Sequence, residues 1–336
     1  MRRYPASKNM RRGFILSTIF CLAILLASTG VLLSRNGGTR DETRLEYITE
    51  AEASDLEILS DLKKEGIVNN WTGSVLFLMS AIGKDIEAGA YRLSRSMNVF
   101  ELYHSLANPY MRYVKVAEGL RKEQIAELFD KKLLWEQSDK EEFLNAHLAL
   151  NRPHLEGYYF PGTYLFPLQE EGLVVGKIML AKFNEQVVKA NKQLSQEVIN
   201  TDTIVKIASL IQREAGGKSD MRLISGIIWN RMFAGMKLDI DATLQYAKGN
   251  EEVGWWPKVK PQDKLIDSPY NTYKYQGLPP TPIANPGKDA INAALNPVKT
   301  SCLFYLHDKR RQIHCSKTYE GHLANIRRYY GTRNAR

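Results

Sequence analysis

Glu214 is the residue whose position best suits chemistry, because it closes a predicted amphipathic helix that begins at Thr203. The apolar residues of this helix follow helical spacing at Ile204, Ile207, Ala208, Ile211 and Ala215. At one turn per 3.6 residues, Glu214 lies about 80° from the centre of that stripe, on the shoulder of the buried face. A carboxyl group there is partly desolvated, which raises its pKa and suits a general acid near neutral pH.

The alternative interpretation is a surface glutamate paired with a nearby cation. The sequence offers Arg213, Lys218 and Arg222 as partners. Gly216 and Gly217 follow directly, and we expect them to end the helix and to leave room for a bulky ligand.

A second group of polar and aromatic residues lies downstream of Glu214. The candidates for substrate contact are Asn230, Asp241, Thr243, Gln245, Tyr270, Asn271 and Tyr273. Aromatic rings mixed with amides and hydroxyls suit a sugar, which presents apolar C–H faces and many hydroxyl groups. Asp239 and Asp241 are possible acidic partners of Glu214 in the reaction. We interpret Asp241 as a residue that organises its loop through hydrogen bonds. The alternative is that the tyrosines anchor ordinary loops.

Cysteines and histidines cluster near the C-terminus, at Cys302, His307, His314, Cys315 and His322. Their spacing matches no common zinc pattern, so we predict neither a metal nor a cofactor. Residues 303–306 predict a short strand, residues 309–311 a turn, and the chain from Gln312 a partner strand. Cys302 and Cys315 would then face each other and could form a disulfide outside the cytoplasm.

The N-terminal segment predicts a membrane anchor. Residues 14–33 form a run of 20 residues without a charge, which as a helix matches the hydrocarbon core of a bilayer. Five Lys or Arg residues precede it, so we expect residues 1–13 in the cytoplasm and the span in the cytoplasmic (inner) membrane. The chain after Arg35 would then lie outside, in the periplasm. The alternative is a cleaved signal peptide. Of the net charge of +9, these five cations supply a large part, so the basic balance does not indicate nucleic acid binding.

The predicted fold class is α+β, with the parts following one another along the chain. Residues 34–66 are a polar tether and a helix, residues 67–150 a small α+β module with a linking region, and residues 151–336 a larger mixed α/β domain. Ala88 to Tyr91 predict a turn into a strand, and Asn98 is a candidate N-cap for the helix after it.

Several motifs, in order, resemble the endolytic murein transglycosylases, the YceG-like family. Residues 155–161, LEGYYFP, are similar to the family's LEGYxFP entry, and residues 207–215 resemble its catalytic helix, with Glu214 on the catalytic glutamate. The segments YNTY at 270–273 and GLPP at 277–280 match without change. Four positions depart from the family pattern, at Gly162, Ala242, Cys315 and Gly321; Ala242 replaces a proline.

The resemblance implies an enzyme that cleaves the β-1,4 bond between N-acetylmuramic acid and N-acetylglucosamine within glycan strands, leaving 1,6-anhydro ends and terminating strand elongation. It also implies a single membrane helix, a LysM-like module at roughly 67–117, and contact with peptidoglycan synthases. Two alternatives remain open: a hydrolase of the same bond, and a non-catalytic glycan-binding anchor for cell-wall synthesis proteins.

Overall fold

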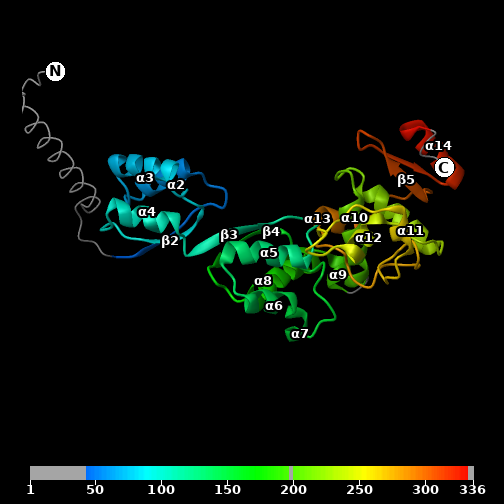
Figure 1. Cartoon of the computed structure of the whole chain (residues 1–336), viewed down its shortest axis with the longest axis horizontal. Coiled ribbons are helices and arrows are strands. Elements are labelled where there is room, and N and C mark those ends of the chain that lie inside the picture. The colour runs from blue at the N-terminus through cyan, green and yellow to red at the C-terminus, as the bar shows by residue number, and fades with distance from the viewer. Residues whose placement is uncertain (1–42, 197–199, 332–336) are drawn as a thin grey trace, which may run out of the picture. The chain divides into compact units, whose positions relative to one another are not determined.

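The chain combines helices and sheets, which confirms the predicted mixed α/β architecture (Figure 1). The computed structural model describes residues 43–196 and 200–331. They form two compact units, divided between Tyr113 and Val114. The predicted membrane span over 14–33 lies outside the described residues, and none of the helices within 43–196 and 200–331 is long and apolar enough to cross a bilayer. The predicted domain boundaries at residues 67 and 151 stay predictions.

The first unit packs three helices with antiparallel strands. Its elements are β1 (Leu45–Ile48), α2 (Asp55–Lys64), α3 (Asn70–Ile82), β2 (Gly89–Leu93), α4 (Val99–Ala107) and the start of β3 (Met111–Val116). Strand β2 pairs with both β1 and β3. The core gathers fully buried side chains such as Leu62, Leu76 and Leu102 from the three helices.

The helix predicted after Asn98 is confirmed as α4, with Asn98 as its N-cap. The Asn98 side chain accepts hydrogen bonds from the backbone N–H groups of Phe100 and Glu101 at 2.9 and 3.0 Å. Glu101 returns the contact by accepting from the N–H of Asn98 at 2.8 Å. This reciprocal pair satisfies donors that the first helical turn would otherwise leave open.

The second unit contains the candidate chemistry. Its elements before Glu214 are α5 (Lys122–Leu133), α6 (Gln137–Leu144), α7 (Ala146–Ala149), β4 (Gly162–Pro167), α8 (Gly172–Phe183), the π-helical turn η2 (Asn184–Lys189), α9 (Lys192–Ser195) and α10 (Thr201–Glu214). Its later elements are α11 (Met221–Phe233), α12 (Asp241–Lys248), the 3₁₀ turn η3 (Pro261–Leu265), α13 (Lys288–Leu295), β5 (Phe304–His307), β6 (Ile313–Ser316) and α14 (Tyr319–Tyr330).

Helix α10 is the centre of this unit and packs against α11, α12 and α13. It begins at Thr201, two residues before the predicted start, because the Asn200 side chain caps it by accepting from the N–H of Thr203 at 3.1 Å. The predicted stripe is buried, since Ile204, Ile207 and Ile211 are inaccessible to solvent. Burial of this face fixes the direction in which the end of the helix points.

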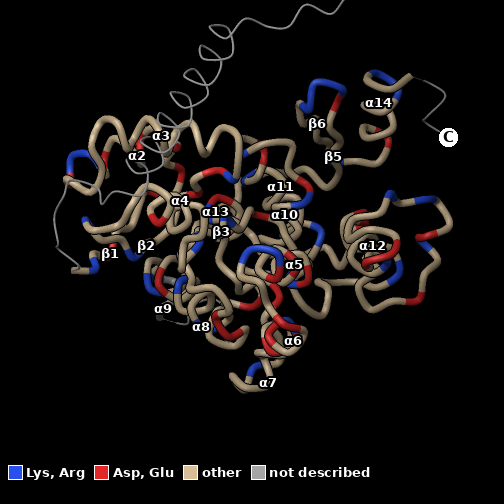
Figure 2. Tube along the Cα trace, turned by 60° about the vertical axis from the view of Figure 1, so that its left-hand side comes forward, with Lys and Arg blue, Asp and Glu red and all other residues tan. Residues whose placement is uncertain are grey.

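The predicted C-terminal hairpin is confirmed as β5 and β6. The two strands pair antiparallel with Tyr305 opposite Cys315, and α14 packs on both of them. The turn between the strands, which carries Lys309, Arg310 and Arg311, is the blue segment beside the label of β6 in Figure 2.

A buried polar cluster around Glu156 ties the LEGYYFP segment to the rest of the unit. The Glu156 carboxyl group accepts hydrogen bonds from Lys122 N, Asn285 Nδ2 and the Tyr246 hydroxyl at 3.2, 2.9 and 3.2 Å. Gly157 follows with φ at +87°, and a Cβ atom there would lie only 2.6 Å from Pro282. Only glycine combines this backbone conformation with so close an approach.

Candidate active site

Glu214 is the last residue of α10, and the chain turns away directly after it. Ala215 is extended, and the backbone N–H groups of Gly216 and Gly217 donate to the Asp220 carboxylate at 3.0 and 3.2 Å. A Cβ atom on Gly216 would lie 3.0 Å from the His307 ring. Gly216 therefore lies against the hairpin, whereas only Gly217 faces the open space that the sequence predicted for both glycines.

Glu214 lines a cavity of about 550 Å³, a volume in the usual range for ligand sites. Its walls come from α11, the segment before α12, Tyr273, β5 and α14. The lining residues are Glu214, Ile227, Ile228, Arg231, Leu238, Asp239, Ile240, Asp241, Lys264, Tyr273, Phe304, Tyr305, Leu306, His307, Tyr319 and His322. Aromatic rings, carboxylates and cations therefore surround one space.

Two donors hold the Glu214 carboxyl group. The Tyr305 hydroxyl donates to Oε2 at 2.7 Å, and the backbone N–H of Ala242, in the first turn of α12, also hydrogen-bonds the carboxyl group. Burial raises the pKa of Glu214 and the negative charge of Asp241 adds to this, while Tyr305, His307 and Ala242 oppose it. The net direction is upward, so Glu214 keeps its proton to higher pH than an exposed glutamate does.

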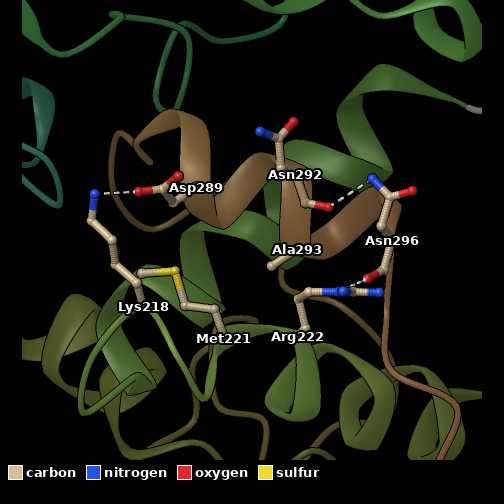
Figure 3. Close-up of a pocket in the computed structure, with 7 residues that line it drawn as sticks. All are labelled: Lys218, Met221, Arg222, Asp289, Asn292, Ala293 and Asn296. Atoms are coloured by element: carbon tan, nitrogen blue, oxygen red, sulfur yellow. Dashed lines mark hydrogen bonds and ion pairs between the residues drawn. The ribbon is translucent and has the colours of Figure 1, made fainter.

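The surface ion-pair interpretation of Glu214 is wrong, because the three cations near it in sequence are engaged elsewhere. Lys218 pairs with Asp289 at 2.5 Å, and Arg222 Nε donates to the Asn296 carbonyl at 2.8 Å, both at a second cavity between α11 and α13 (Figure 3). Arg213 lies over the Trp256 ring, 3.7 Å from its centroid.

Asp241 and Tyr273 are the two predicted substrate contacts that the structure brings to the cavity of Glu214. The Tyr273 hydroxyl donates to Asp241 Oδ1 at 2.7 Å. The Lys264 ammonium lies 4.3 Å from the centroid of the Tyr273 ring, at the same cavity. Asp239, the other possible acidic partner, lines the cavity but pairs with Arg231 at 3.2 Å.

The other five predicted contacts do not line this cavity, and their polar atoms bond to nearby parts of the chain. Asn230 Nδ2 donates to the carbonyls of Thr300 and Cys302, at 2.8 and 3.0 Å. Buried Asn271 donates to the carbonyls of Lys264 and Ile266, at 3.0 and 2.8 Å. These two side chains shape the loops that form the cavity walls.

The remaining three predicted contacts, Thr243, Gln245 and Tyr270, also bond to other parts of the chain. The Thr243 hydroxyl is buried and donates to the Ile240 carbonyl at 2.7 Å. Gln245 Nε2 donates to the Pro257 carbonyl at 3.2 Å, and the Tyr270 hydroxyl bonds to that of Thr281 at 2.8 Å. All three side chains therefore support loops in the structure, and a direct role in substrate binding stays a prediction.

Sequence reasoning missed Tyr305 and Asp220, and it considered His307 only as part of the C-terminal cluster of cysteines and histidines. His307 Nε2 lies 2.7 Å from Asp220 Oδ2, so the hairpin is joined to the loop after Glu214. The alternation of a strand offered a clue, because Tyr305 and His307 are two residues apart and thus lie on one face of β5. The sequence did not indicate that this face is turned toward α10.

Cys302 and Cys315 form a disulfide, with an S–S distance of 2.12 Å. Neither sulfur is therefore available as a thiolate ligand. Within residues 43–196 and 200–331, no group of His, Cys, Asp and Glu side chains is arranged to hold a metal ion.

A sheltered carboxylic acid, held by two donors at the wall of a cavity with aromatic and polar side chains, is the arrangement that enzymes use for general acid–base chemistry. The model of the YceG-like family matches residues 48–328, and the chain belongs to this family.

Its relatives agree with this assignment. The chain is 30% identical over 301 residues to the endolytic murein transglycosylase of Bacillus subtilis, with 82% of each chain covered. It is 27% identical over 311 residues to the endolytic murein transglycosylase of Streptococcus pneumoniae, covering 80% of this chain but 55% of the relative. The crystal structure of a YceG-like protein from Listeria monocytogenes superposes with a TM-score of 0.59 at 27% identity, covering 83% of this chain and 97% of that one.

Proposed function

We propose that the protein is an endolytic murein transglycosylase that cleaves peptidoglycan glycan strands, with Glu214 as its single acid and base. The observation that carries the proposal is the position of Glu214, whose carboxyl group opens on the cavity, bonds to Tyr305 and has a raised pKa. The names of the relatives from Bacillus subtilis and Streptococcus pneumoniae support the same activity.

The proposed reaction has two proton transfers. Glu214 first gives its proton to the oxygen that links N-acetylmuramic acid to N-acetylglucosamine, and the bond from C1 to that oxygen breaks. The C6 hydroxyl of the same muramoyl ring then bonds to C1, and its proton passes to the Glu214 carboxylate. The acid is regenerated, a 1,6-anhydro end forms, and no water is consumed. Cleavage within a nascent strand would end its elongation.

This reaction differs from hydrolysis in the number of carboxylates that it needs. A hydrolase uses one acid and a second carboxylate as base or nucleophile. Asp239 and Asp241 line the cavity, but one pairs with Arg231 and the other accepts a hydrogen bond from Tyr273. Both therefore already have structural partners, which favours the single-acid reaction and gives Asp241 the role of a loop organiser.

The test is digestion of purified peptidoglycan with the full-length protein, followed by mass analysis of the products. We expect internal cleavage with 1,6-anhydro ends, and we expect Glu214→Gln to lower the rate by at least about 100-fold because general acid catalysis is lost. The matched control is Glu142→Gln, at an exposed position on α6, which should keep full activity.

Two results would contradict the proposal. Reducing ends in place of anhydro ends would identify a hydrolase. Unchanged biological activity of Glu214→Gln would identify a non-catalytic glycan-binding anchor.

The location follows from the sequence of residues 1–35, and we propose a single-pass inner-membrane protein with the second unit outside the cytoplasm. The test is fractionation of cells, followed by protease treatment of spheroplasts. The protein should sediment with membranes, and the part after residue 35 should be digested. Recovery in the soluble fraction would contradict the membrane anchor.

The family resemblance also supports two finer proposals. The first is that residues 67–117 form a LysM-like module, and the second is that the protein contacts peptidoglycan synthases. Crosslinking in cells, followed by identification of the attached proteins, tests the second proposal.

A further inference from the structure

We propose that Tyr305 is a positioning residue that holds Oε2 of Glu214, so that Oε1 carries the proton to and from the substrate. The inference rests on the proposed function, because it assigns a role in that reaction to a residue outside the matched motifs. Tyr305 comes from a strand 91 residues after Glu214, and it reaches the acid across the cavity wall.

The direct contact defines which oxygen is engaged. The Tyr305 hydroxyl donates to Oε2 at 2.7 Å, the length of a strong hydrogen bond to a carboxylate. Burial and the neighbouring Glu214 raise the pKa of Tyr305 well above its ordinary value, so the phenol remains a neutral donor. A donor fixed on Oε2 leaves Oε1 as the oxygen that carries the acidic proton.

The strand that carries Tyr305 is attached to α11 before it reaches Glu214. Asn230 donates to the Cys302 carbonyl at 3.0 Å, and Arg231 Nε donates to the Leu303 carbonyl at 2.6 Å. These bonds fix the backbone two and three residues before Tyr305. The hydroxyl therefore has little freedom to leave the acid.

The strand is attached on its other side as well. His307 bonds to Asp220 at 2.7 Å, and the same Asp220 carboxylate binds the two N–H groups that follow Ala215. The Cys302–Cys315 disulfide joins the segment just before β5 to β6. The acid and its donor are thus held by one connected set of bonds, which is the preorganisation that catalysis requires.

This arrangement matters most between the two proton transfers. When Oε1 gives up its proton, Glu214 becomes an anion in a sheltered site. The Tyr305 O–H and the Ala242 N–H stabilise that anion until Oε1 takes the proton of the C6 hydroxyl. Without Tyr305 the carboxyl group can rotate, and its anion loses one of these donors.

Several other groups act on the protonation of Glu214, and an experiment must keep them constant. Arg213 lies on the same helix, Asp241 on α12, Tyr273 in the loop after it, and His307 on β5 beside Tyr305. Arg231 and Asp239 line the same cavity as an ion pair.

The test is Tyr305→Phe in the full-length protein, with kcat and KM measured across pH on purified glycan strands. We expect kcat to fall roughly tenfold or more, with little change in KM, because a hydrogen bond to a charged group is lost. The basic limb of the kcat profile should move to higher pH, since the lost donor had stabilised the ionised acid.

The matched control is Tyr329→Phe. Tyr329 stacks on His314 in the same C-terminal segment, does not line the cavity, and loses the same single oxygen atom. Its pH profile should equal that of the wild type. A basic limb that does not move in Tyr305→Phe would overturn the inference.

A second measurement separates positioning from substrate binding. In the Glu214→Gln background, Tyr305→Phe should leave the affinity for glycan strands unchanged, whereas a loss of affinity as large as the loss in kcat would contradict the inference. If Glu214→Gln itself keeps full activity, the proposed function fails. If only the Tyr305 results disagree, the proposed function stands and the role of Tyr305 does not.

Discussion

The carboxyl group of Glu214 is controlled by groups with opposite effects. Burial and Asp241 raise its pKa, whereas Tyr305, His307 and the N–H of Ala242 lower it. The predicted position of Glu214, on the shoulder of the buried face of α10, identified the residue and the direction of its pKa shift, because both follow from helical periodicity. The two donors could not be predicted, since they arrive from α12 and β5.

Ala242 allows a sharp test of this balance. The family's motif has a proline at this position, and proline has no N–H to donate. In Ala242→Pro the acid loses a donor, so its pKa rises and the basic limb of the kcat profile moves to higher pH. Proline is tolerated in the first turn of a helix, so α12 should stay folded.

Two further variants serve as controls for Ala242→Pro, and neither should move the basic limb to higher pH. Ala242→Ser keeps the N–H and should leave the pH profile in place. Asp241→Asn removes a negative charge near Glu214, so the pKa of the acid falls and the basic limb moves to lower pH. An Ala242→Pro profile that matches that of Ala242→Ser would show that this N–H has no influence.

At the level of elements, the hairpin β5–β6 contributes Tyr305, the side chain that donates to the acid at the end of α10. The sequence predicted both strands, because alternation and the turn residues fix a hairpin locally. It also placed Cys302 opposite Cys315, but Tyr305 is the residue opposite Cys315, and Cys302 lies before β5. Whether the sulfurs bond, and which residues of α11 the hairpin contacts, depends on distant side chains such as Asn230 and Arg231. Those contacts lie beyond the reach of local patterns.

The disulfide should therefore matter for catalysis as well as for stability. We expect the double variant Cys302→Ser and Cys315→Ser to lose about 3 kcal/mol of unfolding free energy, the usual effect of a loop of this length. Its kcat should fall while KM changes little, because the hairpin holds Tyr305 less firmly.

A reductant distinguishes this effect from other consequences of the substitutions. Dithiothreitol should lower the kcat of the wild type toward that of the double variant, and it should leave the double variant unchanged. A wild-type enzyme that keeps its full kcat after the thiols are shown to be free would contradict the prediction.

At the scale of the molecule, the second unit buries a second carboxyl group, that of Glu156, which does not line the cavity of Glu214. Burial raises the pKa of Glu156 to about 8, and the negative charge of Glu123 adds to this shift. The LEGYYFP motif predicted an aromatic turn but not this cluster, because the partners Lys122, Tyr246 and Asn285 come from three other segments.

This burial makes the stability of the fold depend on pH. The folded state keeps a proton on Glu156 that the unfolded chain releases above its ordinary pKa of 4.5. The associated stability is present in full below that pH and is lost as the pH rises through about 8. Glu156→Gln stays neutral and can still bond to Tyr246 and Asn285.

We therefore expect Glu156→Gln to unfold at a higher denaturant concentration than the wild type at pH 9, with the difference shrinking toward pH 4. Urea unfolding at several pH values measures this. A difference that does not change with pH would mean that Glu156 is ionised in the folded protein.

The distance along the chain between Glu214 and Tyr305 has a consequence for how the enzyme comes into being. A ribosome completes α10 well before it reaches β5, so a partly made or truncated chain ending before residue 304 carries the acid without its anchor. Full competence then waits for the last segment to be translated and for the disulfide between Cys302 and Cys315 to form. The proposed enzyme would thus reach its full rate only in finished copies.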